Sequence, residues 1–570
     1  MKRDSWYSRL RSCSLVCCLA MTLQTQAQSE VRFGGLTFNR DLMMAWDFAA
    51  LSRTQPFGTA RAMGMGGAFV SLGADLTAMS LNPAGLGMYR HNEVSVTPLV
   101  PFSRATTSGT EPWAGNNKSG FALANIGAAF NLFEKANNGV VSVTLGFGLN
   151  RVADFNTRYS YASERRYDGS SMVPSIADLF AQQMQVNGVF PAPNPDGGPN
   201  GRLEYRNPYF WPAVLAYKSA MTHVVYDDRG NLVWEADAIG PRASILRSVD
   251  AVESGSINEF NLSAGVNIDN LVYVGASLGI QSVHKSSTLV YGEEYGYFYG
   301  SDDGYAYGPD GMLPVQLEYA DLWQRTVIDG SGVNFKLGVI VRPVAGLRLG
   351  MAVHTPTFYS LDRSYKAGMD YSLLANNPSY ADKSERLESP TQYDEAGNSW
   401  DFVSPTRLMF GASYTFGKFA IVSVDYERDW FNGIRVKNVP DGADFGTESY
   451  KSDFKANFRA VNQLRAGIEI RPLPLFALRA GYGYASSMLK EASLAYEVPQ
   501  TTDSRYFSLG AGVSLSRTVS LDVAYQRLSE HQSRYRLFYS YMNGNFNIDS
   551  GLYETSLTRN FMSVSLSFHF

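Results

Sequence analysis

The sequence predicts an all-β fold, a transmembrane antiparallel β-barrel of about 14 strands that is plugged by an N-terminal hatch. Three observations lead to this prediction. From residue 93 onward, apolar and polar residues alternate in segments of strand length. Short connections between these segments alternate with long, polar ones. The chain also ends on an alternating segment whose last residue is aromatic, Phe570.

Residues 1–27 have the composition of a secretory signal peptide. Basic residues precede an apolar run from Cys13 to Leu23, and Thr25-Gln26-Ala27 places small residues at positions −3 and −1 of a cleavage site after Ala27. A lipoprotein signal needs a small residue before the modified cysteine, whereas here Cys17 precedes Cys18. All three cysteines lie in this segment. The mature chain is therefore expected to contain no disulfide and no thiolate metal site.

Charge and hydropathy further restrict the class of protein to which the chain can belong. Removing residues 1–27 takes away four basic residues and one acidic residue, which leaves 45 Lys and Arg against 52 Asp and Glu. That balance argues against a nucleic-acid-binding surface. No later apolar run reaches the roughly 18–20 residues of a membrane helix. An exported chain of this kind is either soluble or crosses a membrane as a closed barrel.

Residues 28–92 lack the strand pattern and form the distinct N-terminal part of the mature chain. Gly64, Gly66 and Gly67 suit close approach of one backbone to another. Asp75 can cap a short helix that must end before Asn82-Pro83. A compact, glycine-rich segment ahead of a wide barrel suits a plug, because a lumen of that width exceeds what wall side chains fill.

Residues 93–570 supply the barrel. Six short connections and seven long ones separate the alternating segments, which gives an even number of strands. The longest predicted loop covers residues 164–254. Within it, Met172 to Val189 has helical spacing and ends at Gly188. A Tyr-Asp-x-x-Gly-Asn pattern begins at Tyr226 and again at Tyr393; we interpret its Asp and Gly as hairpin-turn residues rather than calcium ligands.

The final segment predicts which face of a strand meets lipid. Met562, Val564 and Leu566 point one way in a strand, while Ser563 and Ser565 point the other. A soluble sandwich strand would alternate in the same way. The number and length of the strands favour a membrane barrel, and a strand that stops on a C-terminal aromatic resembles the closing strand of a bacterial outer-membrane barrel.

Two motifs in the N-terminal part resemble a known family. Arg61–Phe69 reads R-A-M-G-M-G-G-A-F, and Asp75–Gly85 reads D-L-x-A-x-x-x-N-P-A-G. Both are similar to the N-terminal hatch of the FadL/TodX outer-membrane transport family. The resemblance covers the mature chain in architecture, but its motifs are confined to residues 59–90, and this chain has longer loops. It implies a fourteen-stranded barrel, a hatch motif at Asn82, Pro83 and Ala84, and uptake of hydrophobic compounds, with long-chain fatty acids as the type case.

The same resemblance implies that ligand leaves sideways where the third strand kinks inward. Candidate kink positions are Gly146 and Gly148 in the predicted third strand, Val140 to Asn156. Glycine is also common in barrel walls, so ordinary packing is the alternative interpretation. Charged residues predicted to face the lumen either bind an anionic ligand group or hold the plug by ion pairs; Glu469 and Arg479 are examples.

The sequence contains two patterns that resemble catalytic or cofactor-binding motifs, but neither has the flanking secondary structure that its motif requires. Gly275-Ala276-Ser277-Leu278-Gly279 matches a nucleophile-elbow pattern but lies inside an alternating strand. Gly64-Met65-Gly66 lacks the strand that a dinucleotide loop requires. The six histidines are scattered, without metal-ligand spacing. We therefore expect no enzyme activity, no catalytic residue, no metal and no cofactor.

The sequence thus predicts an outer-membrane transporter of a Gram-negative bacterium for passive uptake of hydrophobic small molecules, with both termini periplasmic. Its expected partners are a hydrophobic ligand, outer-membrane lipid and lipopolysaccharide, and the barrel-assembly machinery during insertion. No nucleic-acid partner is expected. The alternative is a PorV-like docking barrel for secreted proteins, which the long loops would suit. A hatch argues against a general porin.

Overall fold

The computed structural model describes twelve ranges of the chain: 31–38, 40–108, 116–135, 139–169, 173–236, 242–297, 315–375, 382–393, 400–440, 446–490, 503–543 and 545–570. The predicted signal peptide, residues 1–27, lies outside the described residues. Among those residues, no helix is long and apolar enough to span a membrane.

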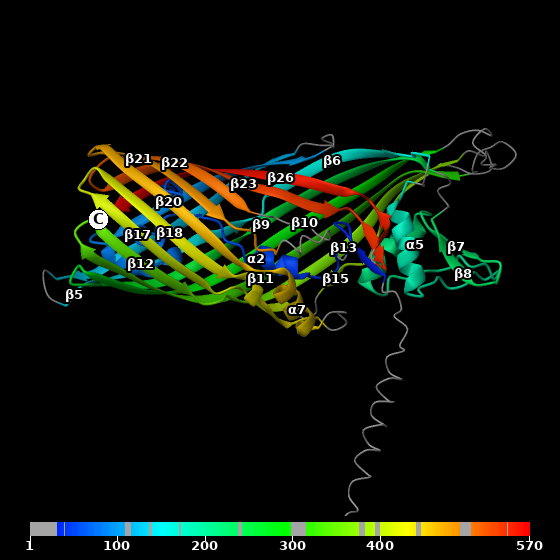
Figure 1. Cartoon of the computed structure of the whole chain (residues 1–570), viewed down its shortest axis with the longest axis horizontal. Coiled ribbons are helices and arrows are strands. Elements are labelled where there is room, and N and C mark those ends of the chain that lie inside the picture. The colour runs from blue at the N-terminus through cyan, green and yellow to red at the C-terminus, as the bar shows by residue number, and fades with distance from the viewer. Residues whose placement is uncertain are drawn as a thin grey trace, which may run out of the picture.

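Antiparallel strands close into a barrel with fourteen wall positions, which confirms the predicted β-barrel and its strand number (Figure 1). The last strand pairs with the first, so the wall has no free seam there. In chain order the positions are β2 (Glu93–Thr107); β3 (Asn117–Ser119) with β4 (Ala122–Glu134); β5 (Val140–Asp154) with β6 (Thr157–Arg166); β9 (Arg242–Ile268); β10 (Val272–Tyr297); β11 (Val315–Val344); β12 (Leu347–His354) with β13 (Phe358–Ala375); β14 (Lys383–Glu388), β15 (Gln392–Tyr393) and β16 (Trp400–Val403) with β17 (Arg407–Phe416); β18 (Ala420–Trp430) with β19 (Arg435–Asn438); β20 (Ala460–Leu473); β21 (Phe476–Ala485); β22 (Ser504–Ser514); β23 (Val519–Arg536); and β26 (Leu552–His569).

The closing strand β26 has the sidedness that its sequence predicts. Met562 and Val564 are 52% and 39% exposed on the outer face, whereas Ser563 and Ser565 are buried. Similar rows of exposed apolar side chains run along the other wall strands, for example Leu278 and Ile280 on β10. This alternation gives the barrel the apolar outer band of a membrane-spanning wall.

Several strands are much longer than a membrane requires. β9, β10 and β11 contain 27, 26 and 30 residues, whereas a spanning strand needs about 9–11. β6 ends at Arg166 and β9 begins at Arg242, so the predicted loop 164–254 is wrong at both bounds. Beyond the apolar band the inward residues of these strands stay largely apolar, but the outward ones are mixed, as Leu246 and Ser248 show on β9. Alternation therefore marks these parts less clearly.

The connection between β6 and β9 forms a small module at the long-loop end of the barrel (Figure 1). It contains α5 (Ile176–Val186), η2 (Pro208–Phe210), α6 (Trp211–Lys218) and the hairpin β7 (His223–Tyr226) with β8 (Leu232–Glu235). The predicted helix is α5, which Gly188 follows with a φ of 63°.

The hairpin tip of this module confirms the turn interpretation at Asp227. The carboxylate accepts hydrogen bonds from the backbone N–H groups of Arg229 and Asn231, and Gly230 has a positive φ. Hydrogen bonds from the Asn231 side chain and backbone lower the pKa of Asp227. The second occurrence of the pattern falls mostly on residues 394–399, outside the described residues.

The N-terminal segment, residues 31–92, runs along the inside of the barrel (Figure 1). Its elements are β1 (Arg32–Gly34), α2 (Ala45–Leu51), α3 (Ala60–Gly64), α4 (Ala78–Leu81) and η1 (Pro83–Met88). α3 contacts β21, β22, β23 and β26, while η1 contacts β9, β10 and β11 on the other side of the lumen. These short helices therefore bridge opposite walls.

The two ends of the described chain lie at opposite ends of the barrel. Phe570 bonds to Asn92 beside the short turns. β1 instead pairs with β24 (Tyr539–Met542), which forms a hairpin with β25 (Asn545–Asp549) in the last long loop. The expectation that both termini are periplasmic is therefore wrong for the N-terminal end. A three-residue strand whose partner lies 500 residues away leaves no local signal.

This topology predicts surface exposure of the N-terminal strand. In outer-membrane barrels the long loops face outward, and Arg32 is exposed at that end. All native cysteines lie within residues 1–27, so Arg32→Cys introduces a single thiol into the mature chain. We expect a membrane-impermeant maleimide to label it on intact cells. Arg517→Cys, in the short turn between β22 and β23, is the matched control and should be labelled only after lysis; the reverse pattern would contradict the topology.

Candidate functional site

The glycines of the predicted hatch motif lie directly against the barrel wall. A Cβ added to Gly64 would lie 3.1 Å from the Gly510 Cα, and one on Gly66 would lie 3.1 Å from the Tyr482 nitrogen. Gly66 and Gly67 have φ values of 66° and 69°, which favour glycine. The hydroxyls of Tyr506 and Ser508 donate to the carbonyl oxygens of Gly66 and Gly64 at 2.8 and 3.0 Å.

Asn82, Pro83 and Ala84 form a turn that docks on the opposite wall. The Asn82 Oδ1 accepts from the Ala84 N–H at 3.1 Å, and its Nδ2 donates to the Val70 carbonyl at 2.6 Å. Pro83 opens η1, where its missing N–H costs no helix bond. A Cβ on Gly275 or Gly338 would overlap this turn. The wall glycines and the motif are therefore complementary in shape.

Charged wall side chains hold the N-terminal segment at several points. The Arg61 Nε lies 3.1 Å from a Glu469 oxygen, and Arg479 joins Glu469 to Asp522 through contacts of 2.8 and 2.6 Å. The Val70 N–H donates to Asp425 at 2.9 Å. These contacts support the interpretation that lumen-facing charges hold the segment in place.

Gly146 and Gly148 lie in an unbroken part of the wall. β5 pairs with β4 and β9 on both sides of these residues. A Cβ on either glycine would come within about 3 Å of the Met79 side chain of α4. A kink at these glycines stays a prediction. In the structure, the absence of a side chain at these two positions leaves space for the Met79 side chain.

The wall is irregular farther along the same strand. The β5–β9 register shifts between Arg151 and Ala153, and residues 155–156 separate β5 from β6. The Asp154 N–H donates to the Gln55 side chain at 2.9 Å, so this backbone turns toward the N-terminal segment. Pairing with β4 stops at Asn125 opposite Asn150, and among the described residues β6 pairs only with β9. Phe121, beside this interruption, is 80% exposed.

A cavity of about 340 Å³ occupies the barrel between the N-terminal helices and the long-loop end. One part of its lining is apolar and aromatic, and includes Trp46, Phe155, Ile328, Phe431 and Leu528. Another part is charged, and includes Arg40, Arg53, Glu253, Lys285, Glu530 and Arg559. Sequence reasoning missed these charged residues, because they come from strands and loops hundreds of residues apart.

Most of these charges are paired. Arg53 lies 2.7 Å from Glu530, and Lys285 lies 3.2 Å from Glu253. Arg40 differs: its Nη2 donates to the Ser287 hydroxyl at 2.9 Å, but its buried Nε has no acceptor. No carboxylate of the described residues forms an ion pair with it. Arg40 thus places a guanidinium group at the cavity wall without a directly paired carboxylate among the described residues.

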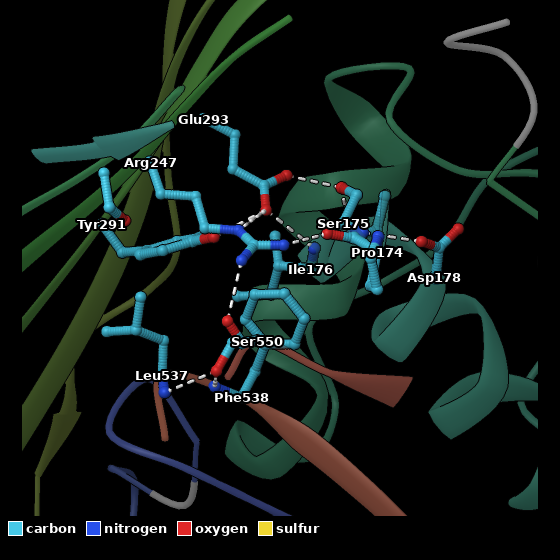
Figure 2. Close-up of polar contacts among 12 residues, drawn as sticks. Pro174, Ser175, Ile176, Asp178, Arg247, Tyr291, Glu293, Leu537, Phe538 and Ser550 are labelled. Carbon is cyan, nitrogen blue, oxygen red and sulfur yellow. Dashed lines mark hydrogen bonds and ion pairs between the residues drawn. The ribbon is translucent and has the colours of Figure 1, made fainter. Parts of the chain in front are cut away.

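Polar contacts hold the start of the module against the barrel wall and the last long loop (Figure 2). The Glu293 carboxylate of β10 accepts hydrogen bonds from the Ser175 hydroxyl and, at 3.0 Å, from the Ile176 N–H at the start of α5. Arg247 donates to the Ser550 carbonyl at 2.9 Å and to the Pro174 carbonyl. Burial and the neighbouring Glu293 raise the pKa of Tyr291 well above its usual value, so this phenol remains a donor to Glu293.

Comparison with known proteins places these features in context. A family model described as outer membrane protein transport protein (OMPP1/FadL/TodX) matches residues 251–550. No curated protein matches the sequence. The toluene transporter TodX of P. putida is 12% identical, with 91% of this chain and 99% of that chain covered at a TM-score of 0.46. A FadL homologue of Pseudomonas aeruginosa is 12% identical, with 91% and 100% covered at a TM-score of 0.48.

Proposed function

Because the chain belongs to the OMPP1/FadL/TodX family of outer membrane transport proteins, we propose that it takes up long-chain-fatty-acid-like amphiphiles by passive diffusion through a plugged barrel. The family consists of transporters of hydrophobic compounds in the outer membrane, and no covalent chemistry is required of its members. We propose the class of ligand, the plugging role of residues 28–92 and the route that the ligand takes.

The cavity is the observation that carries the proposal. Its volume of about 340 Å³ falls within the range of about 300–1,000 Å³ for small-molecule sites. The aromatic and aliphatic part of its lining suits an alkyl chain. The Arg40 guanidinium in the lining suits a carboxylate, since hydrogen bonds between charged groups are the strong ones.

The contacts of the N-terminal segment support a sideways route. The segment is bonded to both walls on the short-turn side of the cavity, so a straight path through the lumen meets packed backbone. The interruption between β4 and β6, with Phe121 beside it, offers an exit toward lipid. We therefore propose that ligand leaves the cavity near Gln55 and Asp154 and enters the outer membrane there.

Binding of oleate to the purified protein tests the ligand class. We expect Arg40→Gln to weaken oleate binding by about tenfold or more, because a charge-assisted hydrogen bond is lost. Binding of oleyl alcohol, which has no carboxylate, should change little. Arg325→Gln, on the exposed outer face of β11, is the matched control. Equal affinities of wild type and Arg40→Gln for oleate would contradict the proposed class.

Docking of secreted proteins is a second candidate function, and the module at residues 173–236 favours it. The module stands beyond the barrel wall, and its hairpin carries Tyr226, which is 54% exposed. If docking dominates, removing the hairpin at residues 223–235 should abolish capture of a purified secreted cargo and leave oleate binding intact. If removal of the hairpin instead abolished oleate binding and left cargo capture intact, transport would be favoured.

A further inference from the structure

Three arginines lie on the outer face of four adjacent strands, at one end of the apolar band. β22, β23, β26 and β2 are consecutive neighbours in the wall. Arg505, Arg527 and Arg104 occupy outward positions on β22, β23 and β2, and all three are exposed. We call these residues the arginine patch.

The register of the strands places the patch at a membrane interface. One row of hydrogen-bonded neighbours contains Leu509, Tyr525, Met562 and Val100. The next row toward the long loops contains Tyr482, Phe507, Arg527, Asn560 and Phe102. The row after that contains Tyr484, Arg505, Ser529, Thr558 and Arg104. The first row is mostly apolar, the second combines three aromatic residues with Arg527 and Asn560, and the third is mostly polar. This is the order seen where a barrel leaves the hydrocarbon.

Two of the three arginines of the patch have no acidic partner among the described residues. Arg104 and Arg527 form no ion pair with any described residue. The Arg505 side chain is 55% exposed, and its Nη2 lies 3.2 Å from an Asp503 carboxylate oxygen. Its guanidinium carbon lies 5.8 Å from the centre of the Tyr484 ring. At the usual sheet spacings, the Cα atoms of Arg505 and Arg527 are about 8 Å apart, and that of Arg104 is about 12 Å from Arg527. Side chains of this length can converge on one headgroup.

The opposite side of the barrel has different chemistry at the comparable height. Beyond Ile280 and Val333, the outward rows on β10, β11 and β13 contain Ser282, Ser331 and Ser360, then His284, Asp329 and Asp362. His284 and Asp329 are paired with each other at 2.6 Å. In these two rows the β10–β13 side contains no arginine or lysine.

We propose that the arginine patch binds the phosphorylated sugar headgroup of the outer-leaflet glycolipid, lipid A of lipopolysaccharide. Arginine binds phosphate through two parallel N–H donors, and these guanidinium groups project at the depth of the headgroups. The partly dehydrated interface strengthens that attraction relative to bulk water. Phe507 and Phe102, which lie in the same row as Arg527, would contact the upper acyl chains. This site is independent of the transport cavity, which lies on the other face of the wall.

Native mass spectrometry of the detergent-solubilised protein titrated with purified lipid A tests the proposal. We expect Arg104→Gln/Arg527→Gln to weaken binding of doubly phosphorylated lipid A by about tenfold or more. Arg505→Gln should have a smaller effect, because Asp503 already shares its charge. Lipid A treated with phosphatase should bind the wild type as weakly as it binds the double variant.

Arg517→Gln is the matched control, because it removes one exposed arginine from the short turn joining β22 and β23 at the other end of the barrel. Retained heat-modifiable migration in gels shows that each variant is folded. The proposal is overturned if the double variant binds within twofold of the wild type, if Arg517→Gln has the same effect, or if dephosphorylated lipid A or phosphatidylglycerol binds as well as lipid A.

Discussion

Deleting residues 28–90 is expected to turn a barrel of low conductance into an open channel. Within the described residues, α3 contacts the β21–β26 side of the lumen and η1 contacts the β9–β11 side. Without them, the lumen of a fourteen-stranded wall is wider than its inward side chains fill, so water and ions should enter. Single-channel recording in a planar bilayer should show conductance about tenfold or more above that of the full chain.

A point substitution separates loss of the plug from loss of the barrel. Gly338→Val adds a side chain where the Asn82 amide lies, while valine suits the strand itself. We expect it to displace the Asn82-Pro83-Ala84 turn and raise conductance partway. Gly120→Ala, in the link between β3 and β4, is the control, because its Cβ would meet only the Pro101 Cγ at 3.6 Å. If both the deletion and Gly338→Val conduct like the wild type, the segment is not what closes the barrel.

The sequence predicted those parts of the fold in which local pattern and environment agree. The tail is the clearest case: its apolar residues meet lipid and its serines meet the packed lumen, so polarity and burial change together along β26. The same agreement fails beyond the membrane band. There β9, β10 and β11 continue as strands with water on the outside, and their outward residues no longer differ in polarity from a loop.

Features built from distant residues were beyond sequence reasoning. Arg40 contacts Ser287 across 247 residues, and β1 joins a hairpin near the C-terminus. α7 (Thr447–Asn457) was also missed, because apart from Ala456 it is polar except for Tyr450 and Phe454, the two buried side chains. That i, i+4 pair was the available signal. The close packing at the glycines of the hatch motif could be predicted, since close approach of one backbone to another favours glycine whichever strand supplies the second backbone.

Replacing Glu469 is expected to cause the largest loss of stability among single substitutions in the lumen. Its side chain is fully buried and accepts contacts from Arg61 at 3.1 Å and from Arg479 at 2.8 Å. Glu469→Gln keeps the shape but removes the charge that both guanidinium groups face. Breaking a buried ion pair by removing one partner costs about 3–5 kcal/mol. Urea unfolding of the protein from lipid vesicles should show a loss of that order.

The third partner of Glu469 supplies the control within the same cluster. Arg471 lies 2.9 Å from the carboxylate, but its side chain is 46% exposed. Arg471→Gln should therefore cost less than about 1 kcal/mol, as exposed pairs do. Arg479 keeps Asp522 in the Glu469→Gln variant, whereas Arg61 loses its carboxylate, so the defect should be concentrated in the N-terminal segment. Faster proteolysis near Arg61, with the barrel still resistant, would show this. If the two variants lose equal stability, burial of Glu469 does not set the strength with which the wall holds this segment.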